Sequence, residues 1–165
     1  MPDHVDGILA QWQRERPDID CSPVGPLGRL SRVHQYVSQN ITAHHKSLGL
    51  HSGEFDVLAT LRRSGAPYRL TPTALFQSAM LSSGAMTNRL NRLEQAGHIR
   101  RLPDPQDRRS LMVALTEQGV ALLDRAFAAH VDNERQIIAQ LPSDQTAQQA
   151  VLLPQWPIPY TNHGP

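Results

Sequence analysis

Two adjacent arginines, Arg108 and Arg109, stand between a turn-forming stretch and a run of alternating apolar residues. The segment 103–116 reads PDPQDRRSLMVALT. Its second half alternates apolar side chains as a half-buried strand does. A guanidinium pair at the tip of such a turn is either plainly solvated or faces an anion, such as the narrow minor groove of DNA. The segments on both sides of the pair must decide between these interpretations.

A short predicted helix precedes the strand that leads into this turn, and it carries polar side chains suited to reading base edges. Met86, Leu90 and Leu93 have helical spacing and are expected to face the core. Asn binds adenine and Arg binds guanine through paired hydrogen bonds. Alone, such a helix is more often a solvated surface, but the hairpin that follows it favours DNA. The expected DNA-contacting residues of this helix are Ser82, Ser83, Thr87, Asn88, Arg89, Asn91 and Arg92.

The order of predicted elements indicates the fold class. Thr71 and Pro72 are start signals for one short helix, and Ser82 and Ser83 begin the next. Ser52 is expected to cap the helix before them, and Thr116 to cap the final long helix, which should continue until Pro142 terminates it. Two short helices followed at once by a hairpin make a winged helix-turn-helix, whose second helix enters the major groove. We therefore predict a mainly α fold with a small β-hairpin.

Long helices are predicted on both sides of this region, and three segments follow from them. Residues 1–20 form an N-terminal extension helix, and residues 51–116 form the winged helix-turn-helix DNA-binding domain. Residues 21–50 and 117–165 form the dimerisation helices and a tail that prolines interrupt. Two-fold symmetry of a dimer would require a pseudo-palindromic operator.

Composition sets broad limits on the function. The 165 residues carry a net charge of only +1, but residues 86–109 hold six arginines against three acids, so positive charge is concentrated there. No stretch is long and apolar enough for a membrane span or a signal peptide, and we expect a cytoplasmic protein with no membrane partner. No phosphate loop or nucleophile arrangement is present, so we expect neither an enzyme nor a cofactor.

Histidines raise the question of a metal site. His44, His45 and His51 lie near a predicted helix end. No cysteine accompanies them and their spacing matches no strong zinc pattern, so a solvated helix end is expected and no metal. We expect His130, on the last long helix, to be a packing or interface residue.

Three charged residues border apolar faces. Ile99 should point inward and share its strand face with Arg101, which would then be half-buried and need a partner. Arg89 lies at the edge of the apolar stripe of its helix, and Asp56 borders the core face of an earlier helix. Taken alone, these positions fit a structural salt-bridge network as well as they fit a ligand site.

The motifs DRRSLMVALTEQG and TNRLNRLEQAGHIRR, with the long flanking helices, closely resemble the MarR family of dimeric bacterial transcription regulators. The resemblance covers roughly residues 27–141. It implies a homodimer that binds double-stranded DNA, with repression more common than activation. In that family a wing-tip arginine reaches the minor groove or backbone while an aspartate shapes the loop. The matching residues here are Arg108 or Arg109, and Asp107.

The segments QWQRERPDID and EFDVLATLRRSGAPY resemble the urate-responsive, PecS-like branch of the family. That branch has a ligand set of one tryptophan, one aspartate and two arginines, and the matching residues are Trp12, Asp56, Arg89 and Arg101. Urate is a planar anion that an indole can stack on and a guanidinium can pair with. We hypothesise that Asp56 pairs with Arg101 until urate displaces it, and that Arg89 then moves the recognition helix.

Two further alternatives stay open at this stage. In the first alternative, the signal is not urate but a phenolic compound or an oxidant. An oxidant would act through Cys21, the single cysteine. A winged helix can also serve protein contacts alone, although such a module would not require the arginine pair of the wing.

Overall fold

The computed structural model describes residues 2–51, 53–79, 86–105 and 110–156. The chain divides into two units, residues 1–43 and residues 44–165. Within the described ranges, no helix combines the length and apolar character needed to cross a bilayer. The elements are α1 (His4–Glu15), α2 (Val24–Ser47), α3 (Glu54–Arg63), β1 (Arg69–Leu70), α4 (Pro72–Ser78), α5 (Met86–Gln95), β2 (Ile99–Pro103), β3 (Leu111–Leu115), α6 (Glu117–Ile138), α7 (Ser143–Leu152) and the 3-10 turn η1 (Leu153–Gln155).

In the first unit, charged residues attach α1 to the first half of α2. Asp3 caps α1 and exchanges hydrogen bonds with Asp6 in a capping box. Arg29 on α2 binds both carboxylates, at 2.8 Å and 2.6 Å. The Arg29 guanidinium lowers the pKa of Asp3 to about 2. Val5 of α1 is buried beside Gly28 of α2.

The second unit contains the predicted winged helix-turn-helix. Strands β2 and β3 form the predicted hairpin, in a register that pairs Ile99 with Leu115 and Pro103 with Leu111. A third strand, β1, pairs with the other edge of β3, so the sheet order is β1-β3-β2. The prediction of a mainly α fold with a hairpin is confirmed, although it missed β1, whose two residues are too few to show an alternating pattern.

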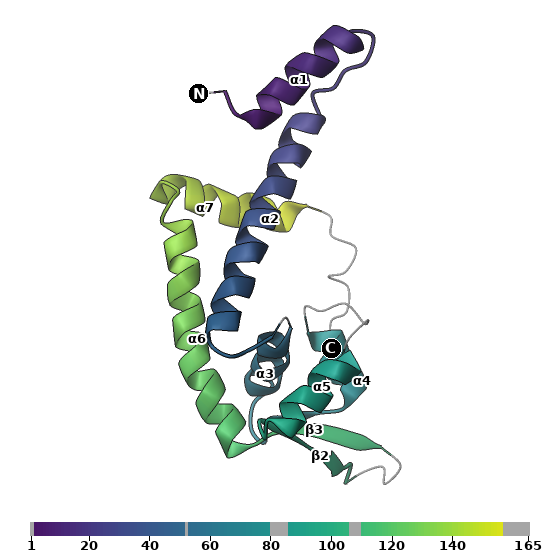
Figure 1. The fold of residues 1–165 in the computed structure, drawn as a ribbon, viewed down its shortest axis with the longest axis vertical. Coiled ribbons are helices and arrows are strands. Elements are labelled where there is room, and N and C mark those ends of the chain that lie inside the picture. The colour runs from purple at the N-terminus through teal and green to yellow at the C-terminus, as the bar shows by residue number, and fades with distance from the viewer. Residues whose placement is uncertain (1, 52, 80–85, 106–109, 157–165) are drawn as a thin grey trace. The chain divides into compact units, whose positions relative to one another are not determined.

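The core of the second unit joins α3, α4, α5, α6 and the sheet. Met86, Leu90 and Leu93 are buried, which confirms the predicted inner face of α5. Leu58 and Leu61 of α3 are fully buried in the same core cluster. Helix α3 packs against α6, α4, α5 and β3, and α5 packs against β2 (Figure 1). Helix α5, which corresponds to the predicted recognition helix, is thus held between α3 and the β2–β3 hairpin, which corresponds to the predicted wing.

Helix starts were predicted better than helix ends. Thr71 caps α4 and Thr116 caps α6, as predicted. The predicted cap of α3, Ser52, lies outside the described residues, and the N-cap residue is Gly53, in the left-handed region at φ 77°. Helix α6 ends at Ile138 and gives way to a turn, so the predicted extension to the residue before Pro142 is wrong.

The histidines near the end of α2 were expected to be solvated, and for His45 this expectation is wrong. His45 is only 5 % exposed and stacks on Phe55, with ring centroids 4.2 Å apart. Its Nε2 lies 3.1 Å from Nδ1 of His130, whose Nε2 lies 3.2 Å from Glu134. A consistent tautomer has His45 donating to His130 and His130 donating to Glu134. His130 is therefore a packing residue, as expected, and His45 is one as well.

Candidate DNA-binding surface and ligand site

The part of α5 that does not pack in the core carries exposed polar residues. Thr87, Asn88, Asn91 and Arg92 are exposed, whereas Met86, Leu90 and Leu93 are buried. Two of the predicted contacts near the start of this helix, Ser82 and Ser83, lie outside the described residues. The wing-tip residues Asp107, Arg108 and Arg109 lie outside them as well.

Arg92, a predicted base-reading residue, makes an ion pair inside the protein. Its Nη2 lies 2.8 Å from Oε1 of Glu54, in the first turn of α3. The Glu54 side chain is buried, whereas that of Arg92 is about half exposed. The second oxygen of Glu54 accepts a hydrogen bond from the backbone N–H of His51 at 2.7 Å. Arg92 thus connects α5 to α3.

Arg101 is half-buried beside the inward-pointing Ile99, as predicted, but its partner is not Asp56. Its guanidinium pairs with Glu94 and donates to Oδ1 of Asn91 at 2.7 Å, and both partners lie on α5. The backbone N–H of Arg101 also donates to Glu94, at 3.1 Å. The hypothesis of an Asp56–Arg101 pair is corrected accordingly, because an acidic residue on the adjacent recognition helix supplies the counter-charge.

Arg89 extends from α5 toward the start of α3. A Cβ atom added to Gly53 would lie only 2.7 Å from Cζ of Arg89, so the guanidinium lies directly against the glycine backbone. The Arg89 side chain is half-buried. This position agrees with an inward orientation of Arg89, and its charge contributes to the electrostatic environment of Asp56.

Asp56 lies half-buried on α3 and lines a cavity of about 500 Å³ between α3 and α6. Burial raises the pKa of its carboxyl group, and the charges of His130, Arg89 and Arg63 act in the opposite direction. The rings of Phe55 and Phe127 also line the cavity, together with Ala59, Arg62, Arg63, Leu123 and Asp124. Arg62 is bound to Asp124, at 2.9 Å. Flat aromatic surfaces beside a partly desolvated carboxylate suit a planar ligand with N–H donors.

The remaining member of the predicted ligand set, Trp12, lies in the first unit. Its side chain is on α1 and the residue is 48 % exposed. An indole with half of its surface in water has a face available for stacking.

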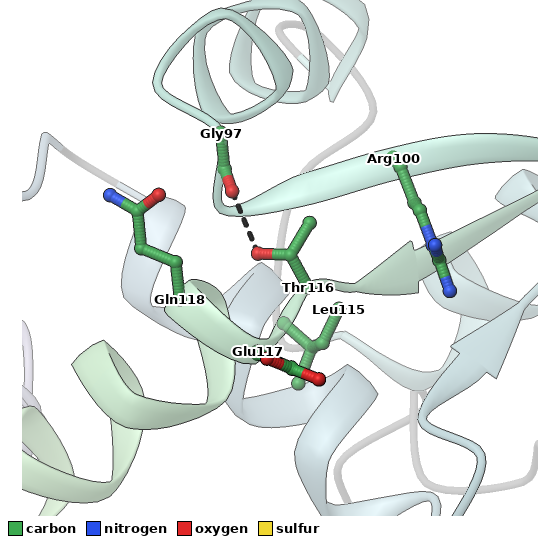
Figure 2. Close-up of a pocket in the computed structure, with 6 residues that line it drawn as sticks. All are labelled: Gly97, Arg100, Leu115, Thr116, Glu117 and Gln118. Carbon is green, nitrogen blue, oxygen red and sulfur yellow. Dashed lines mark hydrogen bonds between the residues drawn. The ribbon is translucent and has the colours of Figure 1, made fainter.

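A second hollow, of about 390 Å³, lies between the turn after α5, the strands β2 and β3, and the start of α6 (Figure 2). Thr116 closes this junction by donating a hydrogen bond from its hydroxyl to the carbonyl of Gly97 at 2.7 Å. Arg100 and Glu117 both line the hollow. Because their charges are opposite, the lining has no clear preference for an anion such as phosphate.

Comparison with known proteins identifies the family. Residues 50–111 match the family model described as "MarR family". The chain is 41 % identical over 149 residues to the HTH-type transcriptional regulator PecS of Dickeya dadantii, covering 90 % of each chain. It is 30 % identical over 130 residues to the multiple antibiotic resistance protein MarR of Escherichia coli, covering 78 % of this chain and 88 % of MarR. The chain belongs to the MarR family.

Solved MarR-family structures have the same architecture. A mutant MarR from Escherichia coli, crystallised with operator DNA, superposes with a TM-score of 0.69 at 29 % identity. The match covers 82 % of this chain and 97 % of that chain. The proteins named in these comparisons are transcription regulators, in agreement with the expectation of a regulator rather than an enzyme.

Two residues of this MarR-family site were missed by reasoning from the sequence. Glu54 pairs with Arg92, and Glu94 pairs with Arg101. In the sequence, each of the two acids looks like any other polar position of a helix. For Glu54 a signal was present, because it stands three residues after His51, where a carboxylate can bind a backbone N–H before the helix. For Glu94 no comparable signal existed, since its contact depends on how the wing packs against α5.

Proposed function

We propose that this protein is a homodimeric transcriptional repressor that binds a pseudo-palindromic operator and is released from it by urate or a related purine anion. The observation that carries the proposal is the position of Arg89. This residue belongs to the recognition helix, yet its guanidinium lies against Gly53 at the start of α3, close in sequence to Asp56 of the cavity. A ligand that changes the charge at Asp56 would act on the recognition helix through Arg89.

DNA binding is supported by the shape of the second unit and by its relatives. MarR of Escherichia coli has been crystallised with operator DNA, and its sequence and fold resemble those of this chain. We propose that α5 enters the major groove with the exposed Thr87 and Asn88 facing the bases. Arg108 or Arg109 would bind the minor groove or the DNA backbone, with Asp107 shaping the loop.

Urate fits the chemistry around Asp56. The rings of a purine would stack on Phe127, which is exposed, and the negative charge of the purine would be attracted by Arg89. The same charge would raise the pKa of Asp56 further, or displace this side chain by repulsion. Such a ligand weakens DNA binding only to the extent that it prefers the conformation that does not bind DNA.

Dimerisation is supported by apolar side chains that α2 exposes. Leu27, Leu30, Val33 and Tyr36 are each more than two-fifths exposed on this helix. Residues three apart are neighbours on a helix surface, so the four form one continuous apolar stripe that winds around α2. A second copy of the chain would cover this stripe and place two recognition helices one turn of DNA apart.

A thermal-shift titration with urate tests the ligand, using wild type beside Arg89→Gln and Arg92→Gln. Both variants remove one charge from the same helix, but only Arg89 is assigned to the ligand set. A ligand that binds only the folded state raises the melting temperature as its concentration rises. Saturable stabilisation should appear in wild type and Arg92→Gln and be lost in Arg89→Gln. No stabilisation of wild type at millimolar urate would reject urate as the signal.

The alternative signal, an oxidant acting on Cys21, has its own test. Cys21 is a free, half-buried thiol between α1 and α2. Peroxide should change the DNA affinity of wild type and not that of Cys21→Ser if the thiol is the sensor. An equal response of the two proteins removes Cys21 from the mechanism.

A further inference from the structure

Glu54 is a buried carboxylate with a specific arrangement of partners. Only 4 % of the residue is exposed. One side-chain oxygen accepts from the backbone N–H of His51, and the other pairs with Arg92. Because a buried charge is costly unless it is paired and hydrogen-bonded, replacing Arg92 would leave this carboxylate poorly satisfied.

Arg92 and Arg89 attach the recognition helix to the same short stretch of α3. They lie three residues apart on α5, and therefore on one side of that helix. Arg92 binds Glu54, and Arg89 lies against the preceding residue, Gly53. Two contacts one turn apart fix the rotation of α5 about its own axis as well as its distance from α3.

We propose that Glu54 is a positioning residue for DNA recognition, which holds α5 in its reading orientation through Arg92, and that Arg92 serves this ion pair rather than a contact with DNA. The inference rests on the proposed function, in which α5 enters the major groove. Thr87 and Asn88 are on the same helix, so a rotation of α5 would move both away from the bases. The role of Glu54 is thus indirect, because its carboxylate lies in the protein interior.

The affinity for DNA across a range of salt concentrations distinguishes positioning from a phosphate contact. The probe is a labelled duplex selected by the wild-type protein from a randomised pool, and binding is followed by fluorescence anisotropy. Loss of a phosphate contact makes the slope of log K against log salt shallower by about 0.9 for each contact. Loss of positioning weakens binding to the selected duplex but leaves that slope unchanged.

We expect Glu54→Gln and Arg92→Gln each to weaken binding about tenfold, which corresponds to the loss of roughly one good base contact. The double variant should bind no more weakly than Arg92→Gln alone, because the two residues act as a pair. Arg92→Lys should recover part of the affinity, since its ammonium can still pair with Glu54. Arg125→Gln, an exposed arginine on α6, is the control and should have no effect.

Hydrogen exchange of the free protein gives a readout that does not depend on DNA. If the ion pair holds α5, Glu54→Gln and Arg92→Gln should speed amide exchange across residues 86–95 and leave residues 117–138 unchanged. A wild-type protein that bound no DNA would refute the proposed function, while this exchange pattern would still test the attachment.

Two results would overturn the proposal. A shallower salt slope for Arg92→Gln, with Glu54→Gln neutral, would make Arg92 a direct phosphate contact. Unchanged exchange in α5 for both variants would mean that the ion pair does not hold the helix. Because the side chain of Arg92 is about half exposed, its glutamine variant should fold even if Glu54→Gln does not.

Discussion

The guanidinium of Arg101 on β2 donates to Oδ1 of Asn91 on α5 at 2.7 Å, and it pairs with Glu94 on the same helix. One side chain therefore joins the wing to the recognition helix. With the Glu54–Arg92 pair on the α3 side, α5 is attached to neighbours on two sides by charged groups. Under the proposed function, a ligand that changed either attachment would alter the DNA-binding surface.

Removing the side chain of Arg101 should loosen the wing. Arg101→Ala leaves Glu94 without its guanidinium partner, and we expect the free energy of unfolding to fall by about 2 kcal/mol. Arg100→Ala is the matched control, because Arg100 is the preceding residue of the same strand and is exposed. Urea unfolding of both variants checks this. Equal stability of the two would show that the Arg101 contacts contribute little.

A methyl group at Gly53 should disturb Arg89 specifically. Gly53 and Gly49 have nearly the same left-handed backbone, at φ 77° and φ 78°. Alanine therefore carries a similar conformational cost of about 1 kcal/mol at both positions. At Gly49 a Cβ would meet nothing within 4 Å, whereas at Gly53 it would collide with Arg89.

The difference between Gly53→Ala and Gly49→Ala in unfolding free energy therefore measures the Arg89 contact. Gly53→Ala should be the less stable variant, and its urate response in the thermal-shift assay should be altered while that of Gly49→Ala is retained. If the two variants behave alike, the guanidinium of Arg89 moves aside freely, and the coupling assigned to it loses its structural basis.

Acid should destabilise the fold through His45. Burial lowers the pKa of His45 to about 4, whereas an unfolded histidine titrates near 6.5. Between about pH 6.5 and pH 4 the unfolded chain binds a proton that the folded protein does not. The free energy of unfolding therefore falls as the pH is lowered through this window and levels off below it. The full contribution of His45 is on the order of 3 kcal/mol.

Urea unfolding at several pH values, with His45→Phe as the comparison, checks this dependence. Phenylalanine keeps an aromatic ring beside Phe55 but cannot be protonated. The variant should lose much of the decline between pH 6.5 and pH 4, whatever its stability at pH 7.5. Asp56, whose pKa is raised by burial, favours the folded state at low pH and is present in both proteins. Parallel curves would mean that protonation of His45 is not the cause.

The elements of the fold could be predicted because their signals are local. Thr71 and Thr116 are side-chain caps, and the burial of Met86, Leu90 and Leu93 follows from helical spacing. The two residues of β1 became a strand only because they pair with β3, which is a tertiary contact. The end of α6 was misplaced because a proline limits a helix without fixing its last residue.

The residues of the site could be predicted better than their partners. Arg101 was expected to be half-buried, and it is, but its partner depends on which of several acids the packing brings close. His45 illustrates the same limit, because its burial results from contact with Phe55 and His130, and His130 is 85 residues away along the chain. Spacing along a chain indicates which face a side chain occupies, not which residue will lie opposite.

The most direct test of the central claim is the release of a bound duplex by urate. The protein is saturated with its selected duplex at fixed salt, and urate is added while anisotropy is followed, for wild type and for Arg89→Gln. We expect urate to release the duplex from wild type in a saturable way, and Arg89→Gln to stay bound. Full release from Arg89→Gln at the same urate concentrations, or no release from wild type, would contradict the account.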